Sequence, residues 1–258
     1  MSLTLHLVFR LTTGLVGTAM ALSSLELALT PLLHDHGLFS WPVLRLRGRH
    51  LTGLDAAARY PVIRAVMAVR ALAAATATAC AVLDASALAP LCVMLCTTVV
   101  LMLRGWPGTE GADHVILIVT VTLLLVSVSP SQTNMLIGAW FLALQAAVAY
   151  FSSGIYKAVT RSWRDGSGLT AILSAYSFGH PALGRLARTH PRLPTLNSWL
   201  VISFETLFPC ALLHPAAAPL FLVTGAFFHI ACAFVMGLNV FPWAFCSLYP
   251  SVLYIAWH

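Results

Sequence analysis

Long runs of apolar residues alternate with short polar stretches along the whole chain. Because a helix that crosses a bilayer needs about 20 consecutive apolar residues, we predict eight membrane spans. The runs are too long and continuous for the alternating strands of a β-barrel, so the predicted fold class is all-α, a polytopic transmembrane helix bundle. The approximate spans are Leu11–Leu33, Ile63–Leu83, Ala87–Leu103, Val115–Val128, Met135–Lys157, Leu196–Leu213, Ala217–Leu238 and Phe241–Trp257.

The composition supports this interpretation and excludes the soluble classes of protein. Of the 258 residues, 59% are hydrophobic and only 9% are charged, and the mean hydropathy is +0.88. A soluble domain usually carries roughly 25% charged residues, and a disordered chain has low hydrophobicity with high charge. We therefore predict one transmembrane domain over residues 1–258, multi-pass in a cell membrane, with the lipid bilayer as its main partner.

The basic residues cluster in two loops between apolar runs, although the formal net charge is +6. The loop His34–Tyr60 holds four arginines and the loop Ala158–Thr195 holds five. Such clustering is typical of membrane topology and supplies no helix or strand that would read a nucleic acid, so we predict no nucleic-acid partner. The six cysteines lie in or beside apolar runs, and no set of residues has the spacing of a zinc site, so we predict neither disulfides nor a metal.

Two ionisable residues fall in the middle of apolar runs, where a charge is costly and therefore indicates function. Glu205 and His229 belong to consecutive spans joined by a tight turn at residues 214–216, which predicts antiparallel neighbours. We expect the two side chains to lie within direct or one-water hydrogen-bonding reach. The pair is predicted to be catalytic, as a proton relay or a quinone-type ligand site; a hydrogen bond that only locks two helices together is the alternative.

Lys157 is the single lysine among fourteen Lys and Arg residues. Arginine does not lose its proton in proteins, whereas a desolvated lysine does, so this choice indicates a position that needs a titratable amine. Burial and the charges of Arg161 and Arg164 would both favour the neutral amine. The alternative is an interfacial anchor, since Lys157 ends a span and long basic side chains reach from there to the headgroups.

Other polar residues are predicted to surround Lys157. Tyr150, Gly154 and Lys157 share one helix face at spacings of four and three, and Gly154 leaves room for a ligand or another helix. Asp113 and His114 open the fourth span on the same predicted side of the membrane. They are candidates to orient or protonate the amine.

The run Tyr150-Phe-Ser-Ser-Gly154-Ile-Tyr-Lys157, followed by Trp163-Arg-Asp165-Gly166, resembles the membrane domain of vitamin K-dependent γ-carboxylase. More broadly it resembles the HTTM family (horizontally transferred transmembrane domain), to which that enzyme belongs. Further matches occur in order: Gly111-Ala-Asp113 opens a span, Glu205 lies mid-span, and Phe228-His229 precedes Met236-Gly237 and Phe241. The resemblance runs from Arg10 to the end of the sequence.

The resemblance implies a base at Lys157 that deprotonates a vitamin K-like hydroquinone, the only cofactor indicated. Around this base we predict substrate-binding roles for Asp113, His114, Tyr150, Gly154, Trp163 and Asp165, and catalytic roles for Glu205 and His229. One residue is inserted between Lys157 and Trp163, and the peptide-capturing extramembrane domain has no counterpart, so we expect no peptide γ-carboxylation. The chain is more similar to short bacterial members, one of which helps to mature a sporulation-delaying peptide toxin.

Two functions follow as hypotheses. The first is a protein of the bacterial inner membrane that uses Lys157 as a base on a hydrophobic, quinol-like substrate, or that assists the maturation of a small peptide with a small partner protein. The second is a non-catalytic membrane factor that binds or escorts a secreted or toxic peptide. The first requires polar partners for Lys157 at a cavity, whereas the second requires only an open apolar groove.

The predicted topology places the two arginine-rich loops on one side of the membrane, because an even number of spans separates them. Their arginine bias predicts the cytoplasmic side, whereas the luminal chemistry of the carboxylase favours the opposite face. Cysteines introduced at Gly48 and Gly184 should react with an impermeant thiol reagent from the same side. Reaction from opposite sides would contradict the eight-span topology.

Overall fold

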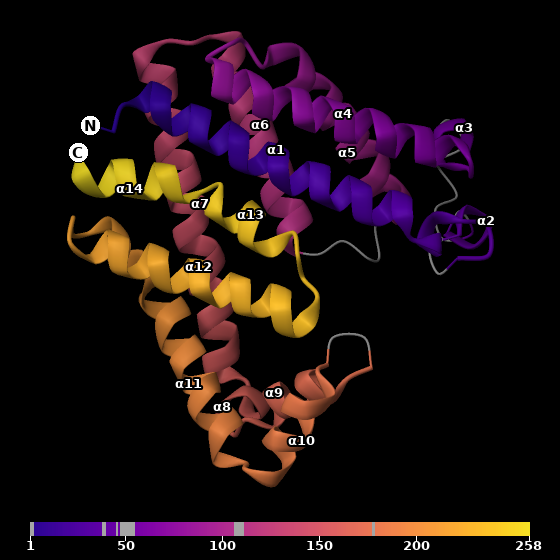
Figure 1. Ribbon diagram of the computed structural model, residues 1–258. Helices are drawn as coiled ribbons and strands as arrows, with labels where there is room; N and C mark the ends of the chain where they lie inside the picture. The colour runs from indigo at the N-terminus through magenta and orange to yellow at the C-terminus, as the bar shows by residue number, and fades with distance from the viewer. Residues whose placement is uncertain (1–2, 38–39, 45, 47–54, 106–110, 177–178) are drawn as a thin grey trace. The chain divides into compact units, whose positions relative to one another are not determined.

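The computed structural model describes the chain except for residues 1–2, 38–39, 45, 47–54, 106–110 and 177–178. The described residues form helices and connecting turns and include no strand, which confirms the all-α fold class. The chain divides into two compact units, an N-terminal unit up to Gly138 and a C-terminal unit, Ala139–His258 (Figure 1). The expectation of a single domain stays a prediction.

The N-terminal unit is built around helices α1 and α4, which pack along each other. A Cβ atom at Gly17 of α1 would lie 2.9 Å from the carbonyl oxygen of Ala74 in α4, so glycine permits the close approach of these two backbones. The elements of this unit are α1 (Leu5–Leu29), η1 (Pro31–Leu33), α2 (Trp41–Leu44), α3 (Asp55–Ala58), α4 (Val62–Leu83), α5 (Leu88–Gly105) and α6 (Gly111–Val128).

The C-terminal unit consists of long helices and a group of short ones (Figure 1). The short helices α8 and α9 pack against α11, and α10 packs against α9. The elements are α7 (Gln132–Val159), which belongs to this unit from Ala139 onward, α8 (Arg161–Arg164), α9 (Ser167–Ser174), α10 (Pro181–Thr189), α11 (Arg192–Leu207), η4 (Phe208–Leu212), α12 (Ala217–Met236), α13 (Phe241–Cys246) and α14 (Tyr249–Trp257).

Helices α1, α4, α6, α7 and α12 are long and apolar enough to cross a membrane, and α5 is a shorter apolar helix. They correspond to six of the predicted spans and support a multi-pass membrane protein. Helix α7, with 28 residues, is about 42 Å long at 1.5 Å per residue, which exceeds the roughly 30 Å of a hydrocarbon core.

The other two predicted spans, Leu196–Leu213 and Phe241–Trp257, are not single helices. The first changes at Phe208 into a 3-10 segment that contains Pro209. The second is broken between Cys246 and Tyr249, and Pro250 stands at the start of α14. Proline lacks the N–H that would continue the α-helical hydrogen bonding, so it ends one helix and begins the next. The count of eight continuous spans is therefore not exact.

The structure also refines the labelling positions for the topology experiment. Gly184 is buried, and a Cβ atom there would lie 2.8 Å from the carbonyl oxygen of Leu173. Thr189 is exposed at the end of the same helix and is a better cysteine position. Gly48 lies outside the described residues.

Candidate functional site

Helices α7 and α11 touch backbone to backbone at Gly154. A Cβ atom at Gly154 would lie 2.6 Å from the amide nitrogen of Thr206 and 2.9 Å from the carbonyl carbon of Glu205. No other residue type fits this contact without moving the helices apart. Gly154 therefore makes room for a helix, one of the two partners that the sequence predicts for it, and it brings Glu205 beside the next turn of α7.

An ion pair forms at this crossing. Lys157 Nζ lies 2.6 Å from Glu205 Oε2, 2.8 Å from Oε1 and 2.6 Å from the hydroxyl oxygen of Ser153. An ammonium group has three N–H donors, and each of these acceptors takes one. The side chains are 13% and 4% exposed for Lys157 and Glu205, so the charges compensate each other in surroundings where an isolated charge would be costly.

Glu205, rather than an arginine, is the charge that acts most closely on Lys157. Arg161 is 92% exposed on its side chain and lies 3.9 Å from Asp165. The arginine charge that was expected to repel the amine is thus exposed to solvent, whereas the Glu205 carboxylate is in contact with the amine. The ring of Trp163 also contacts Lys157, with 5.1 Å from Nζ to the ring centroid, a distance at which an aromatic face attracts a cation.

A second polar group lies on helices α7, α12 and α14. The Tyr150 hydroxyl is 2.6 Å from His229 Nε2 and 2.7 Å from the Tyr249 hydroxyl. Tyr150 also stacks on Phe208 with 4.0 Å between ring centroids. All three members of this chain, Tyr249, Tyr150 and His229, are buried. Their hydrogen bonds hold the rings in fixed positions.

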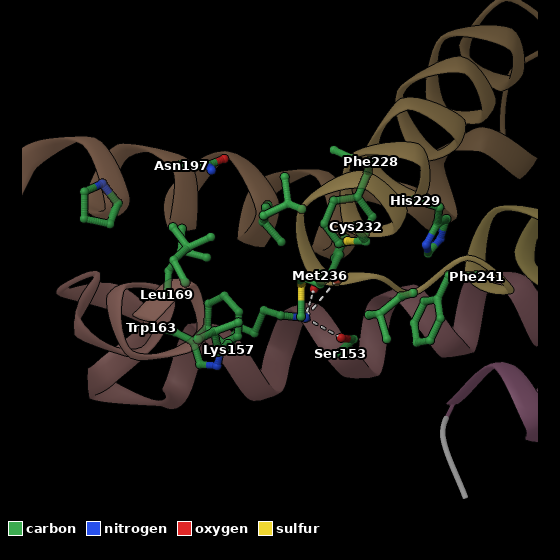
Figure 2. A pocket seen from close by; sticks show the side chains of 18 of the residues that line it. Ser153, Lys157, Trp163, Leu169, Asn197, Phe228, His229, Cys232, Met236 and Phe241 are labelled. Carbon is green, nitrogen blue, oxygen red and sulfur yellow. Dashed lines mark hydrogen bonds and ion pairs between the residues drawn. The ribbon is translucent and has the colours of Figure 1, made fainter. Parts of the chain in front are cut away.

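Both polar groups border one cavity of about 580 Å³, which lies within the C-terminal unit. Figure 2 shows Leu169 and Trp163 toward one end of it, His229 and Phe241 toward the other, and the Lys157 amine between them, near Ser153 and Met236. The remaining wall is mostly apolar. Lys157, Glu205, His229, Tyr150 and Trp163 all line this cavity, so the structure brings these five predicted residues together.

The expected direct hydrogen bond between Glu205 and His229 is not made. Glu205 binds Lys157, and His229 binds Tyr150 through Nε2. The other ring nitrogen of His229, Nδ1, has no hydrogen-bond partner among the described residues. The sequence correctly predicts neighbouring helices, since the Phe204 ring of α11 contacts the Phe228 ring of α12, but each residue is paired through α7.

Asp165 has a local structural role beside the cavity and is not among its lining residues. Its carboxylate accepts a hydrogen bond from the Ser167 amide at 3.0 Å, and its carbonyl oxygen accepts one from the Thr195 hydroxyl at 2.9 Å. Hydrogen bonds from Ser167 lower the pKa of the Asp165 carboxyl below its usual value. Gly166 follows with φ +77°, and a Cβ atom there would lie 2.5 Å from the Thr195 amide nitrogen, so this Asp-Gly step joins α9 to α11.

Asp113 and His114 lie in the first turn of α6, in the N-terminal unit, and they do not line the cavity. The charge of Asp113 acts on Arg70, which is 1% exposed in α4 and whose Nη1 lies 3.4 Å from the Ser23 hydroxyl. A buried arginine requires a counter-charge, and Asp113 supplies a negative charge that acts on Arg70 within its own unit. A role of either residue at Lys157 stays a prediction.

Sequence reasoning missed Tyr249 and gave Ser153 no role. Ser153 stands inside the Tyr150–Lys157 motif, four residues before Lys157, and this spacing signals that the two side chains meet on one helix face. Tyr249 had only the weak signal of a phenol within an apolar segment, because its partner Tyr150 is 99 residues away in the sequence.

A family model described as the HTTM domain matches residues 113–257, more than half of the chain. The matched range contains every residue that lines the cavity and extends from α6 to α14. No curated protein and no solved structure matches the chain.

The backbone contact at Gly154 predicts a cost for any side chain there. Gly154→Ala should lower the free energy of unfolding by about 1–3 kcal/mol, because the new methyl group overlaps Thr206 and forces α7 and α11 apart. Gly14→Ala in the middle of α1 is the matched control, since its Cβ atom would meet only Ala81 at 4.0 Å. Circular dichroism during thermal unfolding in detergent measures both; equal midpoints would contradict the close packing at Gly154.

The ion pair predicts strong coupling between its two members. Lys157→Met should destabilise the protein by about 3 kcal/mol, because it leaves the Glu205 carboxylate buried without its cation. The double variant Lys157→Met/Glu205→Leu removes both charges and should recover most of that loss. Denaturant unfolding in detergent of the unaltered protein, Lys157→Met, Glu205→Leu and the double variant gives the coupling energy. Additive losses would mean that the pair does not stabilise the fold.

Proposed function

Because the chain belongs to the HTTM domain family, we propose that this integral membrane protein binds a small apolar molecule in its C-terminal cavity and exchanges a proton with it through Lys157 and Glu205. The observation that carries the proposal is the placement of the single lysine at the wall of an apolar cavity with a buried carboxylate 2.6 Å away. The chemical class favoured for the substrate is a quinol or a similar weakly acidic hydroxyl compound.

The size of the cavity favours a small molecule over an escorted peptide. Small-molecule sites usually enclose about 300–1,000 Å³ and are lined by apolar side chains with a few polar groups. The present cavity of about 580 Å³ falls within that range and carries its polar groups at Lys157 and His229. Peptide escort requires neither a buried lysine nor a carboxylate partner for it.

The proposed proton transfer uses the short Lys157–Glu205 contact. When the ammonium proton passes to the carboxylate, the Lys157 amine has a free lone pair and both side chains are neutral. The amine then accepts the proton of a substrate hydroxyl, which leaves a substrate oxyanion beside the new ammonium group. The two charges formed in this step replace the two that the first transfer removed, and the opposite charges of the oxyanion and ammonium stabilise each other in the low-dielectric cavity.

The peptide-related part of the hypothesis rests on the family resemblance alone. Maturation of a small peptide at a bacterial inner membrane, with a small partner protein, would require that the activated substrate reacts outside the cavity. Lys157 and its partners provide the proton-transfer step in either case.

The proposal predicts that Lys157→Arg abolishes activity while the protein still inserts and folds. Arginine keeps the positive charge and the pairing with Glu205 but does not give up its proton. Oxygen uptake by the purified protein supplied with an alkylated 1,4-naphthoquinol is the measurement, because the quinolate anion is oxidised by oxygen to quinone and hydrogen peroxide faster than the neutral quinol. We expect at least a tenfold fall in rate, which corresponds to about 1.4 kcal/mol in the barrier.

Two further variants make this test specific. Arg164→Lys, the opposite exchange of arginine for lysine at an exposed position of α8, is the control and should leave the rate unchanged. Glu205→Gln keeps the size of the side chain but removes the proton acceptor, so its rate should also fall. A fully active Lys157→Arg protein at normal membrane abundance would eliminate the base and favour peptide escort.

A further inference from the structure

The hydrogen-bonded chain formed by Tyr249, Tyr150 and His229 has a defined length and ends at the cavity. Its two links measure 2.7 Å between the tyrosine hydroxyls and 2.6 Å from Tyr150 to His229 Nε2. The three side chains are buried, with 8%, 2% and 2% of their surface exposed, respectively. Every proton in this chain must therefore find its acceptor inside the protein or on a ligand.

The direction in which the protons are donated along this hydrogen-bonded chain follows from Tyr249, the end that does not line the cavity. Among the described residues, the Tyr249 hydroxyl has the Tyr150 hydroxyl as its hydrogen-bond partner and no other. If Tyr249 donates to Tyr150, then Tyr150 donates to Nε2 of His229, and the imidazole proton stands on Nδ1. In the opposite direction the Tyr249 proton and the Nδ1 lone pair would both lack a partner, whereas in the first direction only the Nδ1–H does. Each buried polar group without a partner costs about 1–3 kcal/mol, so the first direction is favoured.

We infer that His229 presents an Nδ1–H donor to the cavity, that Tyr249 and Tyr150 fix this tautomer, and that the donor binds an acceptor oxygen such as an aryl ketone or quinone carbonyl. His229 lines the cavity, and its Nδ1 is buried without a hydrogen-bond partner within the described part of the chain, so the acceptor oxygen has to enter between the side chains that cover this atom. The inference rests on the proposed use of this cavity as a ligand site. It assigns Tyr249 as a positioning residue.

The packing around the chain prevents the rings from rearranging. The His229 ring stacks on Phe245 with 4.2 Å between centroids. A Cβ atom at Gly225 would overlap the Tyr249 hydroxyl and lie 3.2 Å from the Phe204 ring, so glycine is required where the hydroxyl enters between α12 and its neighbours. The His229 ring is thus held by Phe245 on one face and by the Tyr150 hydroxyl at Nε2, which keeps its nitrogens in place for directional recognition of one oxygen atom.

The other residues that line the cavity indicate which chemical groups of the ligand adjoin the acceptor oxygen. Phe241 and Phe245 border the His229 end of the wall, and Leu169, Ile172 and Leu173 of α9 contribute to the other part. Aromatic side chains favour an aryl ring beside His229, and the leucines and isoleucine favour an alkyl chain. An aryl ketone with a long alkyl group has both features and carries no hydroxyl proton for Lys157 to remove.

Two probes of equal shape isolate the hydrogen bond. Decanophenone carries a carbonyl oxygen, and 2-phenyl-1-undecene carries a methylene group in its place. Calorimetric titration of the full-length protein in nanodiscs should give about fivefold tighter binding of the ketone, the equivalent of one ordinary hydrogen bond. The ratio of the two affinities is the readout, because a general disturbance of the fold changes both affinities together.

Variants of the chain should change this ratio selectively. His229→Phe keeps an aromatic ring but removes the donor, so the ratio should fall to about 1. His229→Asn places an amide N–H near the position of Nδ1 and should restore a preference for the ketone. Tyr249→Phe should lower the ratio to about twofold, because the imidazole proton is then free to shift to Nε2. Tyr254→Phe lies on the same helix but outside the hydrogen-bonded chain of Tyr249, Tyr150 and His229. It is the matched control and should leave the ratio unchanged.

Nitrogen NMR of protein labelled with ¹⁵N-histidine gives an independent test of the tautomer. The His229 signals are identified by their loss in His229→Phe, and we expect the protonated nitrogen to be Nδ1 and the unprotonated one Nε2. A proton on Nε2, or equal affinities of the unaltered protein for the two probes, would overturn this inference and leave the Lys157–Glu205 proposal standing. A fully active Lys157→Arg protein that still prefers the ketone would overturn the Lys157–Glu205 proposal and leave this inference standing.

Discussion

The C-terminal unit depends on one electrostatic constraint: a cation beside an apolar cavity must have its counter-charge in contact. Lys157 meets that requirement through Glu205 and Ser153, which accept its three N–H bonds. An uncompensated charge in such surroundings costs several kcal/mol, comparable with the whole stability of many domains. The positions of α7 and α11 are therefore linked, because neither charged side chain tolerates separation from the other.

That contact is made possible by the backbone one turn away. Gly154 allows the two helices to approach until its own Cα faces the peptide groups of Glu205 and Thr206. A residue with no side chain thus stands three positions before Lys157, whose ammonium group has to reach Glu205 on the other helix. This relation explains why the Tyr150–Lys157 segment behaves as a unit: Tyr150 contacts α12, Gly154 contacts α11, and Lys157 closes the ion pair.

Hydropathy and helix periodicity predicted the parts of the structure that depend on local sequence. The long apolar helices and the shared face of Tyr150, Gly154 and Lys157 follow from run length and spacing, and the family follows from short ordered motifs. The partners of Glu205 and His229 did not follow, because each lies on another helix, 48 and 79 residues away. Mean hydropathy did not reveal the helix breaks near Pro209 and Pro250, because one proline scarcely lowers the mean hydropathy of a long apolar run.

The two polar groups of the cavity differ in the kind of hydrogen bonding that they offer. Lys157 and Glu205 satisfy each other, so a ligand must displace or share an existing contact there. His229 has its Nε2 occupied by Tyr150 and its Nδ1 without a partner among the described residues, so a ligand oxygen at Nδ1 would displace no existing hydrogen bond. Under the proposed function, we expect a molecule that enters the cavity to bind first at His229, where hydrogen bonding is incomplete. A fixed orientation there is the condition for proton transfer to the amine over a hydrogen-bond distance.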